Sequence, residues 1–117
     1  MLEIQTKHLQ PGIVVLEITG RITIGRECKQ LEWANENLVR EKQEKKVIFD
    51  LTGVTHIDST GVGIIVMSAG QMKEAGGELR LAGPNKHVEQ VLKLASIDKL
   101  VTWTPTVEEA AVAFGEA

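Results

Sequence analysis

The sequence predicts an α/β fold: a mixed β-sheet, mostly parallel with an antiparallel N-terminal hairpin at its edge, flanked by about four helices. After two opening strands, apolar runs of strand length alternate with segments of helical periodicity. This alternation is typical of parallel strands joined by right-handed helical crossovers. A chain of 117 residues is long enough to bury one core, so we expect residues 1–117 to form a single domain.

The chain is expected to begin with a hairpin. Residues 2–8 alternate imperfectly and predict a first strand, and a turn at Gln10-Pro11-Gly12 leads to a second strand at 13–19. Residues 20–25 are expected to connect this hairpin to the first helix.

A helix and a central strand are expected next. The helix runs from about residue 26 to 41. Residues 47–51 are an apolar run, broken by Asp50, which predicts a central strand covered on both faces.

The first predicted helix has one apolar face, and Trp33 lies roughly opposite its centre, at ~100° per residue. We therefore expect Trp33 to be partly exposed. It is either half-covered by neighbouring side chains or a contact for a partner, including weak self-association, because Trp is enriched at interface hot spots. The residues of the apolar face are Cys28, Leu31, Ala34, Leu38 and Val39.

The segment after the central strand predicts a deeply packed helix and a strand. The helix at 60–75 ends at Gly76-Gly77, because Gly tolerates the left-handed cap. A strand follows at 78–82, and residues 83–85 break the chain.

The last part of the chain predicts two helices around a short strand. A helix is expected at 86–95, then a strand at 100–103 in which Trp103 joins the core. A capping box at 106–109 starts a last helix that ends near Phe114. The inward residues of the helix at 86–95 are expected to be Val88, Val91, Leu92 and Ala95.

Composition limits the class of function. A net charge of −3 and an aromatic share of 3% argue against nucleic acid as a partner. The single cysteine, Cys28, excludes an internal disulfide, and neither a signal peptide nor a membrane span is apparent, so we expect a cytoplasmic location. His and Cys residues lack ligand spacing, so no metal and no other cofactor is expected.

Asp58-Ser59-Thr60-Gly61 is the most informative stretch, because it lies between the predicted central strand and the second predicted helix. A helix start offers unpaired N–H groups and a positive dipole end, which favour an anion such as a phosphate attached to the chain. Capping of the helix is the simplest role for the hydroxyls of Ser59 and Thr60. A helix needs only one cap residue, however, and Asp58, Ser59 and Thr60 can each serve as one. We therefore expect at least one exposed hydroxyl to be left over.

Two glycines in the first turn, Gly61 and Gly63, weaken a helix by roughly 1 kcal/mol each relative to Ala. Their missing side chains would let another molecule approach the backbone. A phosphate at this place would add about −1.5 to −2 charge, and Asp58 would oppose it. A partner packed on this surface would respond to that charge more strongly than the fold, as in a binding switch.

Other chemistries fit the residues less well. A nucleophile elbow needs Gly where Ile57 stands, and His56 is too near Ser59 to serve easily as its base. The glycines match neither the Walker nor the dinucleotide pattern. Asp50 as a phosphoacceptor would need an acidic cluster near the chain start, where only Glu3 is found, so we interpret Asp50 as structural or as part of the surface near Ser59.

Three segments in order resemble the STAS domain of anti-sigma factor antagonists, and together they cover essentially the whole chain. They are VIFDLTGVTHIDSTGVG at 47–63, GGELRL at 76–81 and VLKLASIDKL at 91–100. The resemblance implies a single STAS domain at 1–117, with a STAS-like mixed sheet flanked by helices and no enzymatic activity. It implies a partner-switching regulator of transcription in bacteria.

In that family the Ser after the Asp is phosphorylated by an anti-sigma factor that is also a serine-protein kinase, and a PP2C-type phosphatase removes the phosphate. The unphosphorylated protein binds the kinase and frees the sigma factor. The resemblance therefore implies Ser59 as the phosphorylation site and Thr60 as the cap or secondary acceptor. It places partner binding around Asp58, Gly61, Val62 and Gly63.

The family usually has an acidic residue where this chain has Thr23, and two arginines, Arg21 and Arg26, lie nearby in the sequence. We hypothesise that one of these arginines approaches Ser59 and pairs with a phosphate there. Two alternatives stay open. One is a STAS scaffold or transport-system subunit that never meets a kinase, and the other is a small domain that binds a free anion or nucleotide.

Overall fold

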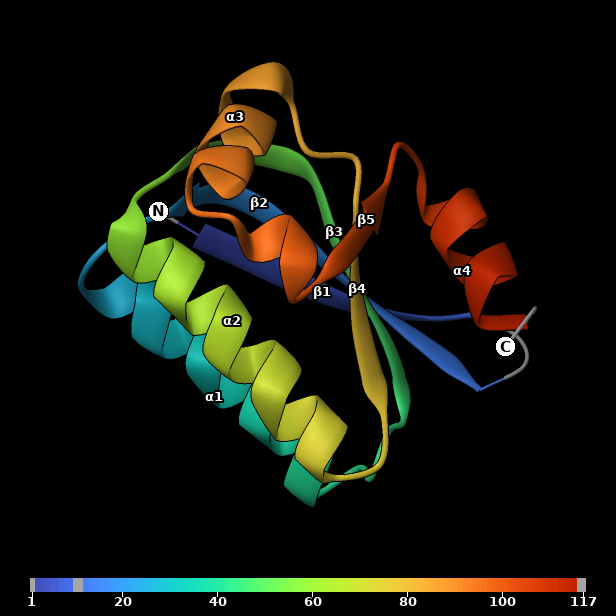
Figure 1. The fold of residues 1–117 in the computed structure, drawn as a ribbon. Helices are drawn as coiled ribbons and strands as arrows, with labels where there is room; N and C mark the ends of the chain where they lie inside the picture. The colour runs from blue at the N-terminus through green and yellow to red at the C-terminus, as the bar shows by residue number, and fades with distance from the viewer. Residues whose placement is uncertain (1, 10–11, 116–117) are drawn as a thin grey trace.

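The computed structural model describes residues 2–9 and 12–115, and over these residues the chain forms a five-stranded mixed sheet flanked by helices (Figure 1). The strands lie side by side in chain order, β1-β2-β3-β4-β5. β1 is antiparallel to β2, and every later neighbour is parallel. The predicted fold class, with its antiparallel hairpin at one edge of a parallel sheet, is confirmed.

The elements follow the predicted order, with one short 3-10 helix, η1, added before the last strand. Their bounds are β1 Leu2–Leu9, β2 Ile13–Ile22, α1 Arg26–Arg40, β3 Lys46–Ile57, α2 Ser59–Glu74, β4 Glu78–Ala82, α3 Lys86–Leu94, η1 Ile97–Lys99, β5 Thr102–Thr104 and α4 Val107–Gly115.

The sheet separates two layers of helices. α1, α2 and α3 cover one face, and α4 lies alone on the other (Figure 1). β3 lies in the middle and sends alternate side chains into both layers: Phe49 packs in the larger core under α1 and α2, and Ile48 packs in the smaller core under α4. This burial on both faces confirms the prediction of a covered central strand.

Two strands run further than their sequence predicts. β2 continues to Ile22 instead of ending at residue 19, and β3 continues to Ile57 instead of ending at residue 51. The extra residues pair with one another in parallel, from Thr19 opposite Gly53 to Ile22 opposite Ile57. One register shift precedes this stretch, between Glu17 and Thr19, and one lies within it, between Gly20 and Arg21. The expected connection at 20–25 therefore shrinks to 23–25, and both strands end directly beside α2.

The segment after α3 also differs from its prediction. Ala95 is exposed, because Ser96 adopts a left-handed conformation (φ 58°) and turns the chain so that Ile97 fills the core position instead. Leu100 is 67% exposed, and β5 begins two residues later than expected.

Trp103 is half-buried against the larger core, in agreement with the prediction that it joins the core. Its indole Nε1 donates a hydrogen bond of 3.2 Å to Glu89 Oε2 on α3, so the polar end of the side chain has a partner.

The amphipathic prediction for α1 is confirmed. Cys28, Leu31 and Leu38 are buried, while Trp33 on the opposite side is 69% exposed. Within the part of the chain that the structure describes, no helix is both long and apolar enough to cross a membrane.

The predicted turn at 10–12 is described only at its last residue. Gln10 and Pro11 lie outside the described residues, and Gly12 has a positive φ of 68°, as the turn prediction requires.

Candidate functional site

The residues around Ser59 occupy a junction of three segments, which are the end of β3, the start of α2 and the end of β2 with its loop into α1. We call residues 58–61 the Ser59 loop. Asp58 N donates to the carbonyl oxygen of Ile22 at 3.3 Å, which continues the β2–β3 contact into the loop. Because β2 and β3 are parallel, their carboxyl ends meet at the same edge of the sheet, and the loop lies there.

The carboxylate of Asp58 connects these segments. Its Oδ1 accepts a hydrogen bond of 2.8 Å from Gly61 N, in the first turn of α2. Its Oδ2 accepts one of 2.9 Å from Ile24 N, in the loop between β2 and α1. Asp58 is therefore the N-cap of α2, and the expectation that Thr60 is the cap is wrong. Asp58 has the extended backbone of a cap residue, whereas Thr60 already lies inside the helix.

The hydrogen bonds keep Asp58 ionised. Its partial burial removes water and pushes the pKa up, but backbone N–H groups of Ile24, Gly61 and Thr60 outweigh this effect and hold the pKa of Asp58 below its ordinary value. Asp58 therefore places a fixed negative charge at the positive end of the α2 dipole, where such a charge is stabilising.

Ser59 is the exposed hydroxyl that the sequence predicts. It is the first residue of α2 and its side chain is exposed, while Thr60 is half-buried. Neither hydroxyl makes a hydrogen bond to any residue in the described ranges 2–9 and 12–115. Asp58 performs the capping alone, so the Ser59 hydroxyl takes no part in starting the helix.

The three residues after Thr60 have different environments. A Cβ built on Gly61 would overlap the carbonyl oxygen of Ile22 and lie 2.9 Å from side-chain atoms of Ile22 and Ile57. Gly61 therefore lets α2 lie directly against β2, so its missing side chain makes room for this chain rather than for another molecule. Val62 is only 7% exposed, whereas Gly63 is exposed with open space around it.

The loop between β2 and α1 lies beside the Ser59 loop because Asp58 holds Ile24. Arg21 and Arg26 are exposed at the two ends of this region, and Thr23 is half-buried between them. Among the described residues, neither arginine forms an ion pair or side-chain hydrogen bond. The structure thus brings the segment at 21–26 to the site and leaves both guanidinium groups without a partner among those residues.

Sequence reasoning missed two contacts of α3 at this edge. Asn85 caps α3 by accepting from Val88 N at 2.8 Å, and its Nδ2 donates to the carbonyl oxygen of Val54 at 3.0 Å, which fastens α3 to β3. The rings of His56 and His87 then meet edge to face, with centroids 5.9 Å apart. An Asn just before a helical segment is a recognised cap signal, but its second partner lies 31 residues away and leaves no local pattern.

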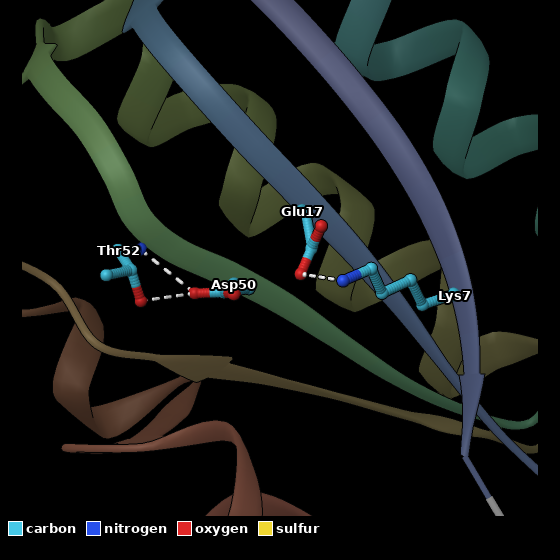
Figure 2. A network of polar contacts seen from close by, with 4 residues as sticks. All are labelled: Lys7, Glu17, Asp50 and Thr52. Atoms are coloured by element: carbon cyan, nitrogen blue, oxygen red, sulfur yellow. Dashed lines mark hydrogen bonds and ion pairs between the residues drawn. The ribbon is translucent and has the colours of Figure 1, made fainter.

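Asp50 has a structural role, one of the two alternatives from the sequence. Its Oδ1 accepts hydrogen bonds from Thr52 N at 3.0 Å and Thr52 Oγ1 at 2.5 Å, as Figure 2 shows. The same view shows Lys7 of β1 paired with Glu17 of β2 at 3.0 Å. Among residues 2–9 and 12–115, no group of three or more His, Cys, Asp or Glu side chains lies close enough to hold a metal ion.

Comparison with known proteins shows that the chain belongs to the STAS domain family. The STAS domain model matches residues 5–110 of this chain, which include β3, the Ser59 loop and the segments on either side of them. A candidate anti-sigma factor antagonist of Thermotoga maritima is 36% identical over 98 residues, which cover 84% of this chain and 86% of that protein.

Solved structures share the fold. The crystal structure of a candidate anti-sigma factor antagonist from Thermotoga maritima has a TM-score of 0.79 at 26% identity and covers 94% of this chain and 92% of its own. The Bacillus anti-sigma factor antagonist SpoIIAA in its unphosphorylated form has a TM-score of 0.73 at 16% identity, covering 98% and 99%. Its phosphorylated form has a TM-score of 0.72 at 17% identity, covering 96% and 99%.

Replacing Asp58 tests its role as cap and connector. We expect Asp58→Ala to lower the free energy of unfolding by about 1–2 kcal/mol at neutral pH, because both carboxylate contacts are lost. The folded-state pKa of Asp58 lies below its ordinary value of 3.8, so its contribution is present above that value and is lost as the pH falls through the lower folded-state pKa. Urea unfolding at several pH values should therefore show that the wild type has a larger free energy of unfolding than Asp58→Asn at neutral pH. This difference should disappear below about pH 4. Asp98→Asn, at an exposed position, is the control. A stability difference between the wild type and Asp58→Asn that persists in strong acid would show that the charge of Asp58 does not stabilise the fold.

Gly61 and Gly63 form a matched pair for alanine substitution. We expect Gly61→Ala to lower the free energy of unfolding by about 1–3 kcal/mol, because its Cβ would press α2 away from β2. Gly63→Ala should be neutral or stabilising by up to about 1 kcal/mol, since the space is open and Ala favours helix. Urea unfolding of the two variants measures the difference, and equal stabilities would show that α2 does not need this close approach.

Proposed function

We propose that this chain, which belongs to the STAS domain family, is an anti-sigma factor antagonist that is switched by phosphorylation at Ser59. Anti-sigma factor antagonists of this family are non-enzymatic regulators, and their partner is an anti-sigma factor. For this chain we propose a partner that is also a serine-protein kinase, and a PP2C-type phosphatase that removes the phosphate. We place the switch in the cytoplasm of a bacterium, in keeping with Cys28 as a free thiol.

The observation that supports the proposal most strongly is the environment of Ser59. Its hydroxyl is exposed and makes no hydrogen bond within the described part of the chain, so phosphorylation there breaks no contact of the described fold. The phosphate would stand at the N-terminus of a 16-residue helix, whose dipole favours negative charge. Thr60 is half-buried and is the secondary candidate.

Like-charge repulsion explains how a phosphate would weaken partner binding. It adds about −1.5 to −2 charge beside the ionised carboxylate of Asp58. A partner that covers Ser59 and the open surface at Gly63 would have to desolvate both anions. Gly61 and Val62 are buried, so we assign them to the support of this surface and not to direct contact.

Arg21 and Arg26 provide the basic groups that such a site needs. Both are exposed, and Asp58 holds the loop between them through Ile24. A guanidinium group forms strong paired hydrogen bonds with phosphate. We propose that at least one of these arginines meets phosphorylated Ser59, and that Thr23 leaves room for this contact where an acidic residue would compete for it.

Incubation with the anti-sigma kinase of the same genome and ATP, followed by mass spectrometry, tests the switch. We expect one phosphate on Ser59, no product from Ser59→Ala, and an unchanged product from the matched control Thr60→Ala. The phosphorylated protein should bind the kinase about 10- to 100-fold more weakly, because of charge repulsion and desolvation. Absence of a phosphate on both Ser59 and Thr60 would refute the switch and favour a STAS scaffold.

Charge reversal tests the arginines. If Arg21 or Arg26 pairs with the phosphate, then Arg21→Glu and Arg26→Glu should change kinase affinity by different factors for the unmodified and the phosphorylated protein. Lys42→Glu, beyond the other end of α1, is the control. Equal effects on both forms, measured by calorimetric titration, would show that neither arginine contacts the phosphate.

A further inference from the structure

The outer edge of β1 is unpaired within the described residues. β1 contacts β2 along its full length, from Leu2 opposite Gly20 to Leu9 opposite Ile13, and no other strand of the described ranges lies on its other side. Such an open edge presents a row of backbone donors and acceptors that pairs readily with another strand. Within β1, the carbonyl oxygen of Leu2 already accepts a hydrogen bond of 3.1 Å from Gln30 Nε2 on α1. Sheet edges of this kind serve as interfaces by strand addition.

We propose that β1 pairs with β1 of a second copy of this chain, antiparallel and around a two-fold axis that passes beside Gln5. The charges of the strand are arranged symmetrically about this residue, with Glu3 two positions before it and Lys7 two positions after it. In this register Glu3 of each copy stands directly opposite Lys7 of the other, so one symmetric interface forms two ion pairs.

Other registers lack this complementarity. Residues directly opposite one another in an antiparallel ladder share a face, so a two-fold axis normal to the sheet must pass beside a residue. An axis at Ile4 places Glu3 opposite Gln5, and an axis at Thr6 places Lys7 opposite Gln5, so neither register pairs Glu3 with Lys7. An axis at Glu3 or Lys7 places like charges opposite one another, which is destabilising.

The charges on this face already form part of a network. Lys7 Nζ lies 3.0 Å from Glu17 Oε2 on β2 (Figure 2). Gln5 is the residue of β1 opposite Glu17 in the ladder. In the proposed dimer, Lys7 would stand between Glu17 of its own copy and Glu3 of the second copy. The pairing therefore places a second carboxylate, Glu3 of the other copy, beside Lys7.

The opposite face of the same edge supplies apolar surface. Ile4 and Thr6 of β1 line a shallow hollow together with Trp33 and Ala34 of α1. In the Gln5-centred register, Ile4 stands opposite Thr6 of the second copy, so the exposed Trp33 side chains of both copies lie near the axis. Burial of Trp33 would then contribute the hydrophobic part of the interface.

This interface leaves the Ser59 loop open. The axis passes beside Gln5 on the outer side of β1, whereas the loop joins β2, on the inner side of β1, at Ile22. The dimer and the phosphorylation switch therefore use different parts of the molecule, and either proposal can fail without the other.

Sedimentation velocity over micromolar to millimolar concentrations tests the dimer. We expect a wild-type dimer that Glu3→Lys and Lys7→Glu each weaken by about tenfold or more, because each change replaces both ion pairs by like charges. An equimolar mixture of the two variants should restore dimerisation, since positions 3 and 7 then carry opposite charges in both facing pairs. The variant Lys7→Glu also loses the ion pair with Glu17. Because this loss is present in both its monomer and the mixed dimer, it does not alter the dimerisation affinity.

Two further variants complete the test. Trp33→Ala should weaken the dimer, and Glu108→Lys on α4 should leave it unchanged, with circular dichroism confirming that every variant is folded. A wild type that stays monomeric over the whole range would overturn the proposal. A dimer that ignores both charge reversals, or a mixture that fails to recover, would also overturn it.

Discussion

The two hydrogen bonds accepted by the Asp58 carboxylate are the interaction on which the rest of the site depends. One bond starts α2 through Gly61 N, and the other holds the loop after β2 through Ile24 N. The arrangement requires α2 to approach β2 so closely that a Cβ at position 61 would overlap the backbone of Ile22. A single side chain therefore sets where the helix begins and which loop lies next to it.

The capping by Asp58 leaves Ser59 free. A serine that capped the helix would be bonded to the backbone, and its modification would disturb the start of α2. Because Asp58 takes that role, the Ser59 hydroxyl is exposed and unbonded within the described residues. The fold and the proposed signal thus depend on neighbouring residues with separate roles, so a charge added at Ser59 would be presented to a partner without disrupting the junction.

Local patterns predicted the order of the elements, the helices and the exposure of Trp33, because helical periodicity and turn residues are properties of short segments. The ends of β2 and β3 were not predictable in this way, since residues 20–22 and 52–57 form strand by pairing with each other across the sheet. The cap was mistaken for a related reason. Asp58, Ser59 and Thr60 are all capable caps, and the choice depends on Ile24 N, which lies 34 residues away from Asp58. Sequence reasoning identified the loop, and tertiary contacts determine the structural roles within it.

We expect the fold to tolerate a phosphate at Ser59, so that the added charge acts on a partner and not on the junction around Asp58. The most direct measurement is the urea unfolding of protein with phosphoserine incorporated at position 59, compared with the unmodified protein. We predict free energies of unfolding that agree within about 1 kcal/mol, as for a change at an exposed position. A loss of stability as large as that caused by removing the Asp58 carboxylate would contradict this expectation.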